Sequence, residues 1–146
     1  MFRDAKREDV PAIVALLADD VLGADRETAD IDEAYWAAFD EIKSDPRNRL
    51  IVADDSGAVV GTLQLTFLPG LSRHGMRRAQ IEAVRVAASG RGQGLGRQMI
   101  SWAIAEARLV GCGLVQLTSD KRRDSAIRFY ESLGFEASHE GLKLLV

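Results

Sequence analysis

The sequence has little of what stabilises small secreted proteins or builds metal sites. It contains one cysteine, Cys112, so no disulfide can form within the chain. Neither histidine stands at a ligand or nucleophile spacing from this cysteine, and we predict no bound metal. The sequence shows no apolar run of 18 residues and no positively charged, apolar leader. We therefore expect a cytoplasmic protein in a reducing compartment.

An excess of charge of one sign is also lacking. The 19 lysines and arginines nearly balance the 22 acidic residues, which leaves a net charge of −3, and both signs are interspersed. This distribution argues against a nucleic-acid footprint and against binding to a membrane surface. With 146 residues, of which 47% are hydrophobic and 28% charged, the composition predicts one globular domain over residues 1–146.

Glycine, in contrast, is concentrated in one stretch, Ile81 to Arg97, around which the rest of the chain is organised. An apolar run with two valines enters this stretch, and a helical apolar pattern leaves it. Between them stand four alternating glycines: Gly90, Gly92, Gly94 and Gly96. A strand, a glycine loop and a helix present backbone N–H groups and the positive end of a helix dipole at one point. An anion, most simply a pyrophosphate, is predicted to bind there.

The glycine spacing decides between known pyrophosphate loops. A dinucleotide fold would place a third glycine at position 97, which is Arg97, and a triphosphate loop would need Lys and then Ser or Thr after a glycine. Neither pattern is present. The pattern that fits is Arg-x-x-Gly-x-Gly, formed by Arg91, Gly94 and Gly96, five residues after the strand residue Val86. This stretch resembles the acetyl-coenzyme A loop of the GNAT N-acetyltransferase superfamily.

A second stretch carries the same resemblance. Ser125 to Phe135 is similar to the family's closing helix and turn, Ala-x-x-x-Tyr-x-x-x-Gly-Phe. The two matches occur in the right order, and the resemblance is specific from Ile81 to Phe135 and only architectural before that. It implies a mixed α/β fold, with a central, mostly antiparallel sheet, a splayed parallel strand pair and about four flanking helices. It also implies acetyl-coenzyme A as the co-substrate.

The resemblance also implies roles for individual residues. Glu82 lies where the family often has its general base, and a carboxylate there would take a proton from a substrate ammonium, directly or through water. Tyr130 lies at the usual general-acid position, and its hydroxyl would give a proton to a leaving thiolate. A solvated strand residue and a core aromatic are the respective alternatives. The implied cofactor-binding residues are Val84, Arg85, Val86, Arg91, Gly92, Gln93, Gly94, Leu95, Gly96 and Arg97.

Two positions depart from the family pattern. Ala88 replaces a proline that often follows the strand valine, and Arg123 replaces an asparagine that often precedes the closing helix. The missing asparagine removes one expected contact to pantetheine, whereas pyrophosphate binding does not depend on either position.

Periodicity and turn residues predict the remaining elements. We expect strands at 1–5, 50–53, 58–68, 78–86 and 114–118, and helices starting at 9, 31, 95 and 126. The first helix should end near Leu22 or Gly23, and short final strands should follow Phe135. On the strand 78–86, Glu82, Val84 and Val86 are predicted to alternate onto one face, with a bulge plausible at Val84.

Each of three further features has two possible interpretations, one structural and one functional. Trp36 is either ordinary packing or part of a substrate wall. The loop 71–77 with His74 and its arginines is either a solvated turn or faces an anion or substrate. The run Lys121, Arg122 and Arg123 is either a solvated loop or lies near the 3′-phosphate of coenzyme A.

Together these features predict an N-acetyltransferase. It would transfer the acetyl group of acetyl-coenzyme A directly to a primary amine of a small or amino-acid-like molecule, with no covalent enzyme intermediate. A protein or peptide N-acetyltransferase and a non-catalytic acyl-coenzyme A sensor remain the alternatives. The expected partner is a small-molecule amine, with neither nucleic acid nor membrane. The apolar end of the chain, Leu142 to Val146, and family habit predict a homodimer.

Overall fold

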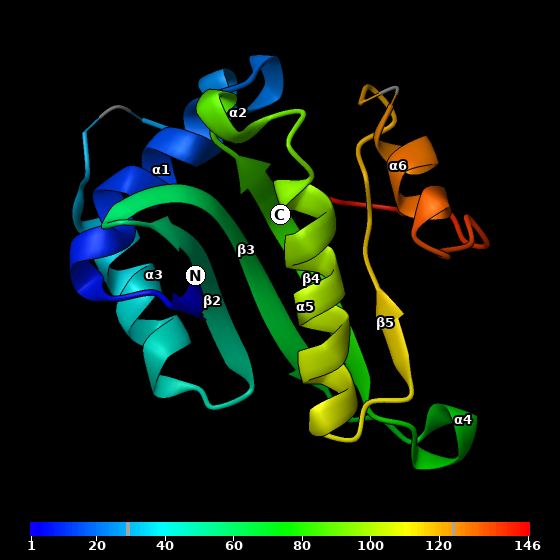
Figure 1. Ribbon diagram of the computed structural model, residues 1–146. Coiled ribbons are helices and arrows are strands. Elements are labelled where there is room, and N and C mark those ends of the chain that lie inside the picture. Colours follow the sequence, from blue (N-terminus) through cyan, green and yellow to red (C-terminus); the bar gives the residue numbers. More distant parts are fainter. Residues whose placement is uncertain (29, 124) are drawn as a thin grey trace. The chain divides into compact units, whose positions relative to one another are not determined.

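The structure is a computed structural model that describes residues 1–28, 30–123 and 125–146. It divides into two compact units, Met1–Gln116 and Leu117–Val146, and each is described by itself. The prediction of one domain over residues 1–146 stays a prediction. The first unit carries the sheet and most of the helices (Figure 1).

A five-stranded sheet forms the first unit, in the order β1-β2-β3-β4-β5. Its strands are β1 (Phe2–Asp4), β2 (Asn48–Asp55), β3 (Ala58–Leu68), β4 (Arg78–Val86) and β5 (Leu114–Gln116). The first three pairings are antiparallel, and β4 pairs with β5 in parallel. The β2–β3 hairpin turns through Ser56 and Gly57, which both have positive φ, as a tight hairpin turn requires. This mixed sheet confirms the predicted fold class.

The first unit also contains five helical segments: α1 (Val10–Ala18), α2 (Val21–Arg26), α3 (Glu33–Ser44), α4 (Ser72–Gly75) and α5 (Leu95–Leu109). Single 3₁₀ turns, Arg7–Asp9 and Ala88–Gly90, precede α1 and follow β4. The prediction that the first helix runs to Leu22 or Gly23 was wrong, because the helix ends at Ala18. A new helix begins after Asp20, whose carboxylate accepts a hydrogen bond from the Gly23 N–H and so caps α2.

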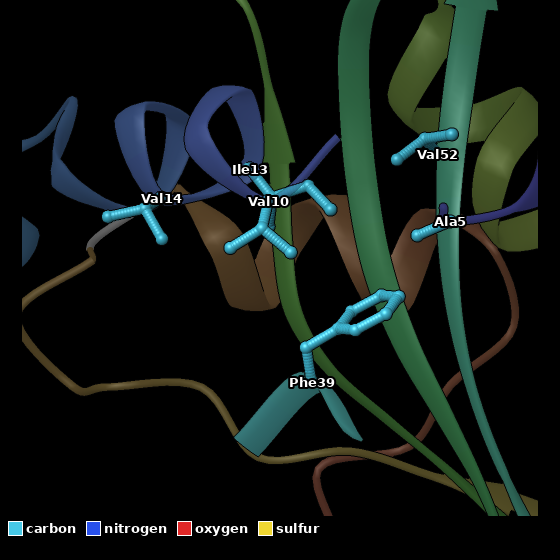
Figure 2. Close-up of a cluster of buried hydrophobic side chains, with 6 residues drawn as sticks. All are labelled: Ala5, Val10, Ile13, Val14, Phe39 and Val52. Carbon is cyan, nitrogen blue, oxygen red and sulfur yellow. The ribbon is translucent and has the colours of Figure 1, made fainter. Parts of the chain in front are cut away.

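The helices cover the two faces of the sheet. Helix α5 crosses one face of β3 and β4 (Figure 1), where a Cβ added to Gly61 would lie 2.7 Å from Met99 Sδ. Because strand side chains alternate, Thr62 and Gln64 belong to the opposite face. On that face α1 and α3 pack, and their side chains Val10, Ile13, Val14 and Phe39 belong to one buried cluster with Val52 of the sheet (Figure 2). Each face of the sheet therefore has its own apolar layer.

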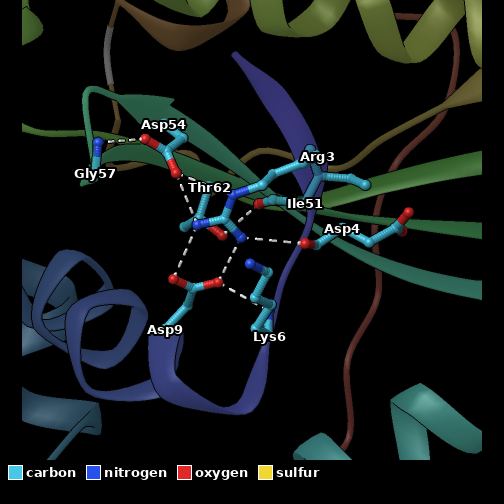
Figure 3. Close-up of polar contacts among 8 residues, drawn as sticks. All are labelled: Arg3, Asp4, Lys6, Asp9, Ile51, Asp54, Gly57 and Thr62. Atoms are coloured by element: carbon cyan, nitrogen blue, oxygen red, sulfur yellow. Dashed lines mark hydrogen bonds and ion pairs between the residues drawn. The ribbon is translucent and has the colours of Figure 1, made fainter.

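An ion-pair network fixes the first strand to the start of α1 (Figure 3). The Arg3 guanidinium donates to both carboxylate oxygens of Asp9, at 2.7 and 3.1 Å, and to Asp54 Oδ2 at 3.0 Å. Asp9 also accepts the Lys6 N–H at 2.8 Å. These bonds lower the pKa of the buried Asp9 carboxyl, with the Arg3 bonds as the largest cause, and the same bonds raise the pKa of Arg3.

We expect Asp9→Asn to lower the free energy of unfolding by about 2 to 3 kcal/mol at pH 7, because it removes a buried acceptor of charge-assisted hydrogen bonds. The exposed pair Arg7–Asp40 supplies the control, and Asp40→Asn should cost less than about 1 kcal/mol. The folded-state pKa of Asp9 lies below the unfolded value near 4, so its contribution is present above that pH and is lost on acidification. Urea melts at pH 7 and pH 3 should show the wild type losing more stability than Asp9→Asn; equal losses would contradict this role.

The second unit contains α6 (Ala126–Ser132), which ends before Gly134 at φ +98°. A left-handed glycine just after a helix is a common way for the helix to end. The predicted final strands are absent, since no strand is assigned at residues 135–146. A strand exists only where its backbone groups pair with a neighbour, and this segment makes no such pairing. Its apolar side chains Leu142, Leu144 and Leu145 are almost fully exposed.

Candidate active site

Strand β4 contains the irregularity that the sequence suggested near Val84. Gln64 pairs with Glu82 and Thr62 pairs with Arg85, so two residues of β4 stand opposite Leu63. One of them, Ala83, has φ +53°, which is unusual for a residue other than glycine. Strained backbone of this kind costs free energy and is concentrated at functional sites. A bulge therefore interrupts β4 directly after Glu82.

The bulge changes which side chains share a face. In an antiparallel pair, directly opposed residues project to the same side, so Glu82 and Arg85 lie with Gln64 and Thr62 on the face that carries α1 and α3. Val86 pairs with Gly61 and lies on the opposite face. The predicted alternation of Glu82, Val84 and Val86 onto one face was wrong, because the extra residue shifts the alternation by one.

Glu82 is exposed at the edge of this face. Its neighbour across the strands, Gln64, lines a cavity of about 130 Å³ together with Ala83 of the bulge. The other walls come from α1, α3 and β2. Geometry thus places the predicted general base beside a cavity whose floor includes the bulge, and it places α1 and α3 over that cavity.

The glycine loop has the conformation that anion binding needs. Gly92 and Gly94 have φ +78° and +81°, and no other atom lies within 4 Å of a Cβ built on either residue. Gly94 is the N-cap of α5 and, lacking a side chain, leaves the first N–H groups of the helix without a side-chain acceptor. Their combined dipole favours an anion at this end of a 15-residue helix.

Two consecutive aspartates between α1 and α2, Asp19 and Asp20, pair with Arg91 of the loop and Arg85 of β4, respectively. Arg91 Nη2 lies 3.1 Å from Asp19 Oδ2, and Arg85 Nε lies 3.4 Å from Asp20 Oδ2. The loop and the bulged strand are therefore both tied to the junction of α1 and α2. The sequence signal for this contact was two consecutive aspartates at a helix end, which the sequence analysis did not use.

Two carbonyls of the predicted pantetheine strand also have arginine partners. The Val84 carbonyl accepts from Arg85 Nη1 at 2.9 Å, and the Val86 carbonyl accepts from Arg91 Nε at 3.2 Å. A ligand that pairs with these carbonyls must compete with the two side chains. Of the remaining loop residues, Gln93 donates to the Ser89 carbonyl at 3.2 Å, Leu95 and Gly96 begin α5, and Arg97 is exposed in its first turn.

We expect Asp19→Asn to tighten binding of coenzyme A about two- to fivefold, because it releases Arg91 from an exposed ion pair worth at most about 1 kcal/mol. Asp25→Asn is the matched control, since it makes the same charge change at an exposed position of α2. Calorimetric titration should show the difference at low salt and a smaller one at high salt. Equal effects of both substitutions would mean that loss of the ion pair with Asp19 does not increase the contribution of Arg91 to coenzyme A binding.

Tyr130, the predicted general acid, lies in the second unit. Its ring makes edge contacts with Phe129 and Phe135, at centroid distances of 5.1 and 5.8 Å. In the loop that precedes α6, Arg122 donates to Asp120 and lowers the pKa of that carboxyl. Arg122 is thus engaged with Asp120. A role of this loop at a 3′-phosphate stays a prediction.

Several residues singled out in the sequence lie elsewhere. Arg78 begins β4 and Arg77 stacks over Phe67, at the end of the strand remote from the glycine loop. Trp36 packs against the α1–α3 cluster with Arg7 over its ring, as the packing interpretation predicts. Its neighbour Tyr35 lines the cavity instead.

Burial raises the pKa of the Cys112 thiol, which does not favour a nucleophile.

Two kinds of feature are absent from the described residues. They contain no group of three or more histidine, cysteine or acidic residues that would hold a metal ion. Within the same part of the chain, no helix is both long and apolar enough to cross a membrane.

A bulged strand, a glycine loop and an uncapped helix start define an α/β domain with a candidate anion site at the strand's carboxyl end. The chain belongs to the GNAT acetyltransferase family, whose model matches residues 12–135. This assignment confirms the resemblance that the two sequence motifs suggested.

Individual relatives agree with the family. The aminoalkylphosphonate N-acetyltransferase of Salmonella typhimurium is 30% identical over 138 residues, which cover 94% of this chain and 85% of the relative. The glucosamine 6-phosphate N-acetyltransferase of Trypanosoma brucei brucei is 36% identical over 89 residues, covering 61% and 58%. A crystal structure described as a transcriptional regulator from Bacillus halodurans C-125 is 50% identical, with a TM-score of 0.98 over 100% of this chain and 99% of the other. The two curated relatives are N-acetyltransferases of small molecules, which supports an acyltransferase activity here.

Proposed function

We propose that this protein transfers the acetyl group of acetyl-coenzyme A directly to a primary amine of a small or amino-acid-like molecule. The observation that carries the proposal is the uncapped start of α5 behind the glycine loop, placed directly after a bulged strand with a carboxylate beside a cavity. Members of the family use acetyl-coenzyme A as the co-substrate.

The residues present fit a diphosphate ligand. Around Gly92 and Gly94 the space is open, and two arginines, Arg91 and Arg97, flank the loop. In this proposal the loop N–H groups and the start of α5 bind the diphosphate, and main-chain groups of Val84, Arg85 and Val86 bind pantetheine. When bound, the co-substrate supplies an acetyl group activated as a thioester.

The chain's own groups then supply the proton transfers. Glu82 takes a proton from the acceptor ammonium, so that the amine is neutral and can attack the carbonyl carbon. A backbone N–H at the bulge, at Val84, donates to the oxygen on which negative charge develops. A carbon–nitrogen bond forms and the carbon–sulfur bond breaks. The attacking nitrogen loses its second proton as the amide forms, and this balances the proton that the departing thiolate takes up, for which the resemblance to the family implies Tyr130 as the donor; no group of the chain becomes acetylated.

The test is a thiol-release assay with acetyl-coenzyme A against a panel of amines, amino acids, aminoglycosides and peptides, together with calorimetry for co-substrate binding. We expect binding without acceptor and thiol release only when an amine is added. Failure to bind acetyl-coenzyme A would refute the proposal, whereas binding without transfer to any amine would leave a sensor.

A non-catalytic acyl-coenzyme A sensor is the second candidate, because the 50% identical structure from Bacillus halodurans is described as a transcriptional regulator. A sensor needs the loop but not the base. A peptide acceptor is the third, and only the substrate panel separates it from a small amine. A homodimer remains a prediction, to be tested by light scattering on the purified protein.

A further inference from the structure

The cavity beside the bulge is apolar. Its walls include Val14 and Leu17 of α1 and Phe39 and Ile42 of α3, and Val14 and Phe39 belong to one buried apolar cluster (Figure 2). Among the described residues that line it, none carries a charge. An anionic group placed there would lose its hydration. Arg85, which stands opposite the wall residue Thr62, is not a lining residue and is paired with Asp20.

Three polar side chains of the cavity wall, Thr62, Gln64 and Tyr35, make hydrogen bonds within the protein. Thr62 Oγ1 donates to the Ile51 carbonyl at 2.9 Å, and Gln64 Nε2 donates to Asn48 Oδ1 at 3.3 Å. The Tyr35 hydroxyl donates to Glu27 Oε1 at 3.0 Å and accepts the Thr28 N–H at 3.0 Å. A polar ligand would have to replace these bonds, whereas an apolar ligand leaves them intact.

We propose that the acceptor amine carries a small uncharged apolar group that occupies this cavity, so that amines bearing phosphate or phosphonate are poor substrates. The inference rests on the proposed acetyl transfer and narrows its substrate class. A volume of about 130 Å³ suits a branched aliphatic group or a single ring, since an apolar protein cavity of about 150 Å³ binds benzene.

The cavity adjoins the residues that we propose to react, which is why we assign it to the acceptor amine. Ala83 of the bulge forms part of the wall, and Gln64, another wall residue, is the strand partner of Glu82. An acceptor with its apolar end between α1 and α3 therefore presents its nitrogen near the carboxylate. The two curated relatives are named for amines with anionic phosphonate or phosphate groups, so the acceptor of this chain differs from theirs in charge.

A matched pair of acceptors tests the proposal. Both 3-methylbutylamine and 2-aminoethylphosphonate carry a branched group two carbons from the nitrogen. This group is an uncharged isopropyl in the first compound and an anionic phosphonate in the second, so the two differ in charge and polarity. We expect kcat/KM to be at least 100-fold higher for 3-methylbutylamine. Along unbranched amines, kcat/KM should rise about fourfold per added methylene until the cavity is full.

Ala38→Phe tests the location, because Ala38 lines the cavity from an exposed position of α3. We expect it to raise KM for 3-methylbutylamine at least tenfold while leaving KM for acetyl-coenzyme A unchanged. Ala37→Phe, at the next exposed position and outside the cavity wall, should change none of these values. Thermal melts check that both variants fold.

The outcomes separate this inference from the activity it rests on. If 2-aminoethylphosphonate or glucosamine 6-phosphate is acetylated faster than 3-methylbutylamine, the acceptor class is wrong and the transferase stands. Equal effects of Ala38→Phe and Ala37→Phe would also overturn the inference. If acetyl-coenzyme A does not bind, or no amine at all releases thiol, the proposed function itself fails.

Discussion

Glu82→Gln should lower kcat for amine acetylation about 100-fold and leave the Kd for acetyl-coenzyme A within twofold. The substitution keeps the size of the side chain and removes only its ability to take a proton. Glu82 is exposed, and its partner on the neighbouring strand is the uncharged Gln64. We therefore expect the substitution to change the free energy of unfolding little. Thiol release at saturating acceptor and calorimetric titration measure the two quantities.

The acceptor can reveal whether the lost function is proton removal. An amine that is already neutral at the assay pH needs no base before it attacks, so Glu82→Gln should slow a weakly basic acceptor such as hydroxylamine much less than a strongly basic alkylamine. Glu41→Gln, at an exposed position of α3, is the control and should change neither rate. A uniform loss for both acceptors would mean that Glu82 positions the substrate and is not the base; no loss for either would exclude it from the reaction.

Local patterns predicted the organising strand and its loop with the correct bounds. Strand β4 runs from Arg78 to Val86 as expected, because alternation of apolar residues is a property of the strand itself. Helix α5 begins at Leu95 after the left-handed Gly94, because glycine spacing reports backbone conformation directly.

The bulge and the cavity depend on pairing between distant segments. Two residues of β4 stand opposite a single residue of β3, Leu63, and this extra residue determines which face Val84 and Val86 occupy. The spacing of residues within β4 does not contain that information. The cavity combines side chains from five elements, so Tyr35 could not be told from Trp36 as its lining residue. The start of the short helix α2 is set by one N-cap residue, Asp20, and the pattern of apolar residues does not predict this cap.

The failure of the predicted final strands has a related cause. Residues 142–146 are as apolar as a buried strand, but a strand also needs a neighbour that accepts its hydrogen bonds. Composition alone does not supply that neighbour, and the segment is exposed and without regular structure. The same exposed apolar side chains are the basis of the predicted homodimer, which a concentration series in light scattering would test.

Gly94→Ala should weaken binding of acetyl-coenzyme A at least tenfold. At φ +81° an alanine is strained by about 1 to 2 kcal/mol, and its Cβ would occupy space that is open at the N-cap position of α5. Gly57→Ala is a matched control, because Gly57 has φ +93° and equally open surroundings but lies in the β2–β3 turn. Both variants should lose similar stability in urea, since both strain a turn, and only Gly94→Ala should lose affinity.

A truncated co-substrate separates loss of the anion site from general damage. S-acetylpantetheine lacks the diphosphate, so it gains nothing from the loop, and Gly94→Ala should turn it over as fast as the wild type does. With acetyl-coenzyme A the same variant should show the full loss in kcat/KM, because only that substrate carries the group which the N–H groups of α5 bind. If Gly94→Ala impaired both substrates alike, or if Gly57→Ala weakened acetyl-coenzyme A equally, the diphosphate would not lie at the start of α5, and the placement of acetyl transfer beside Glu82 would lose its support.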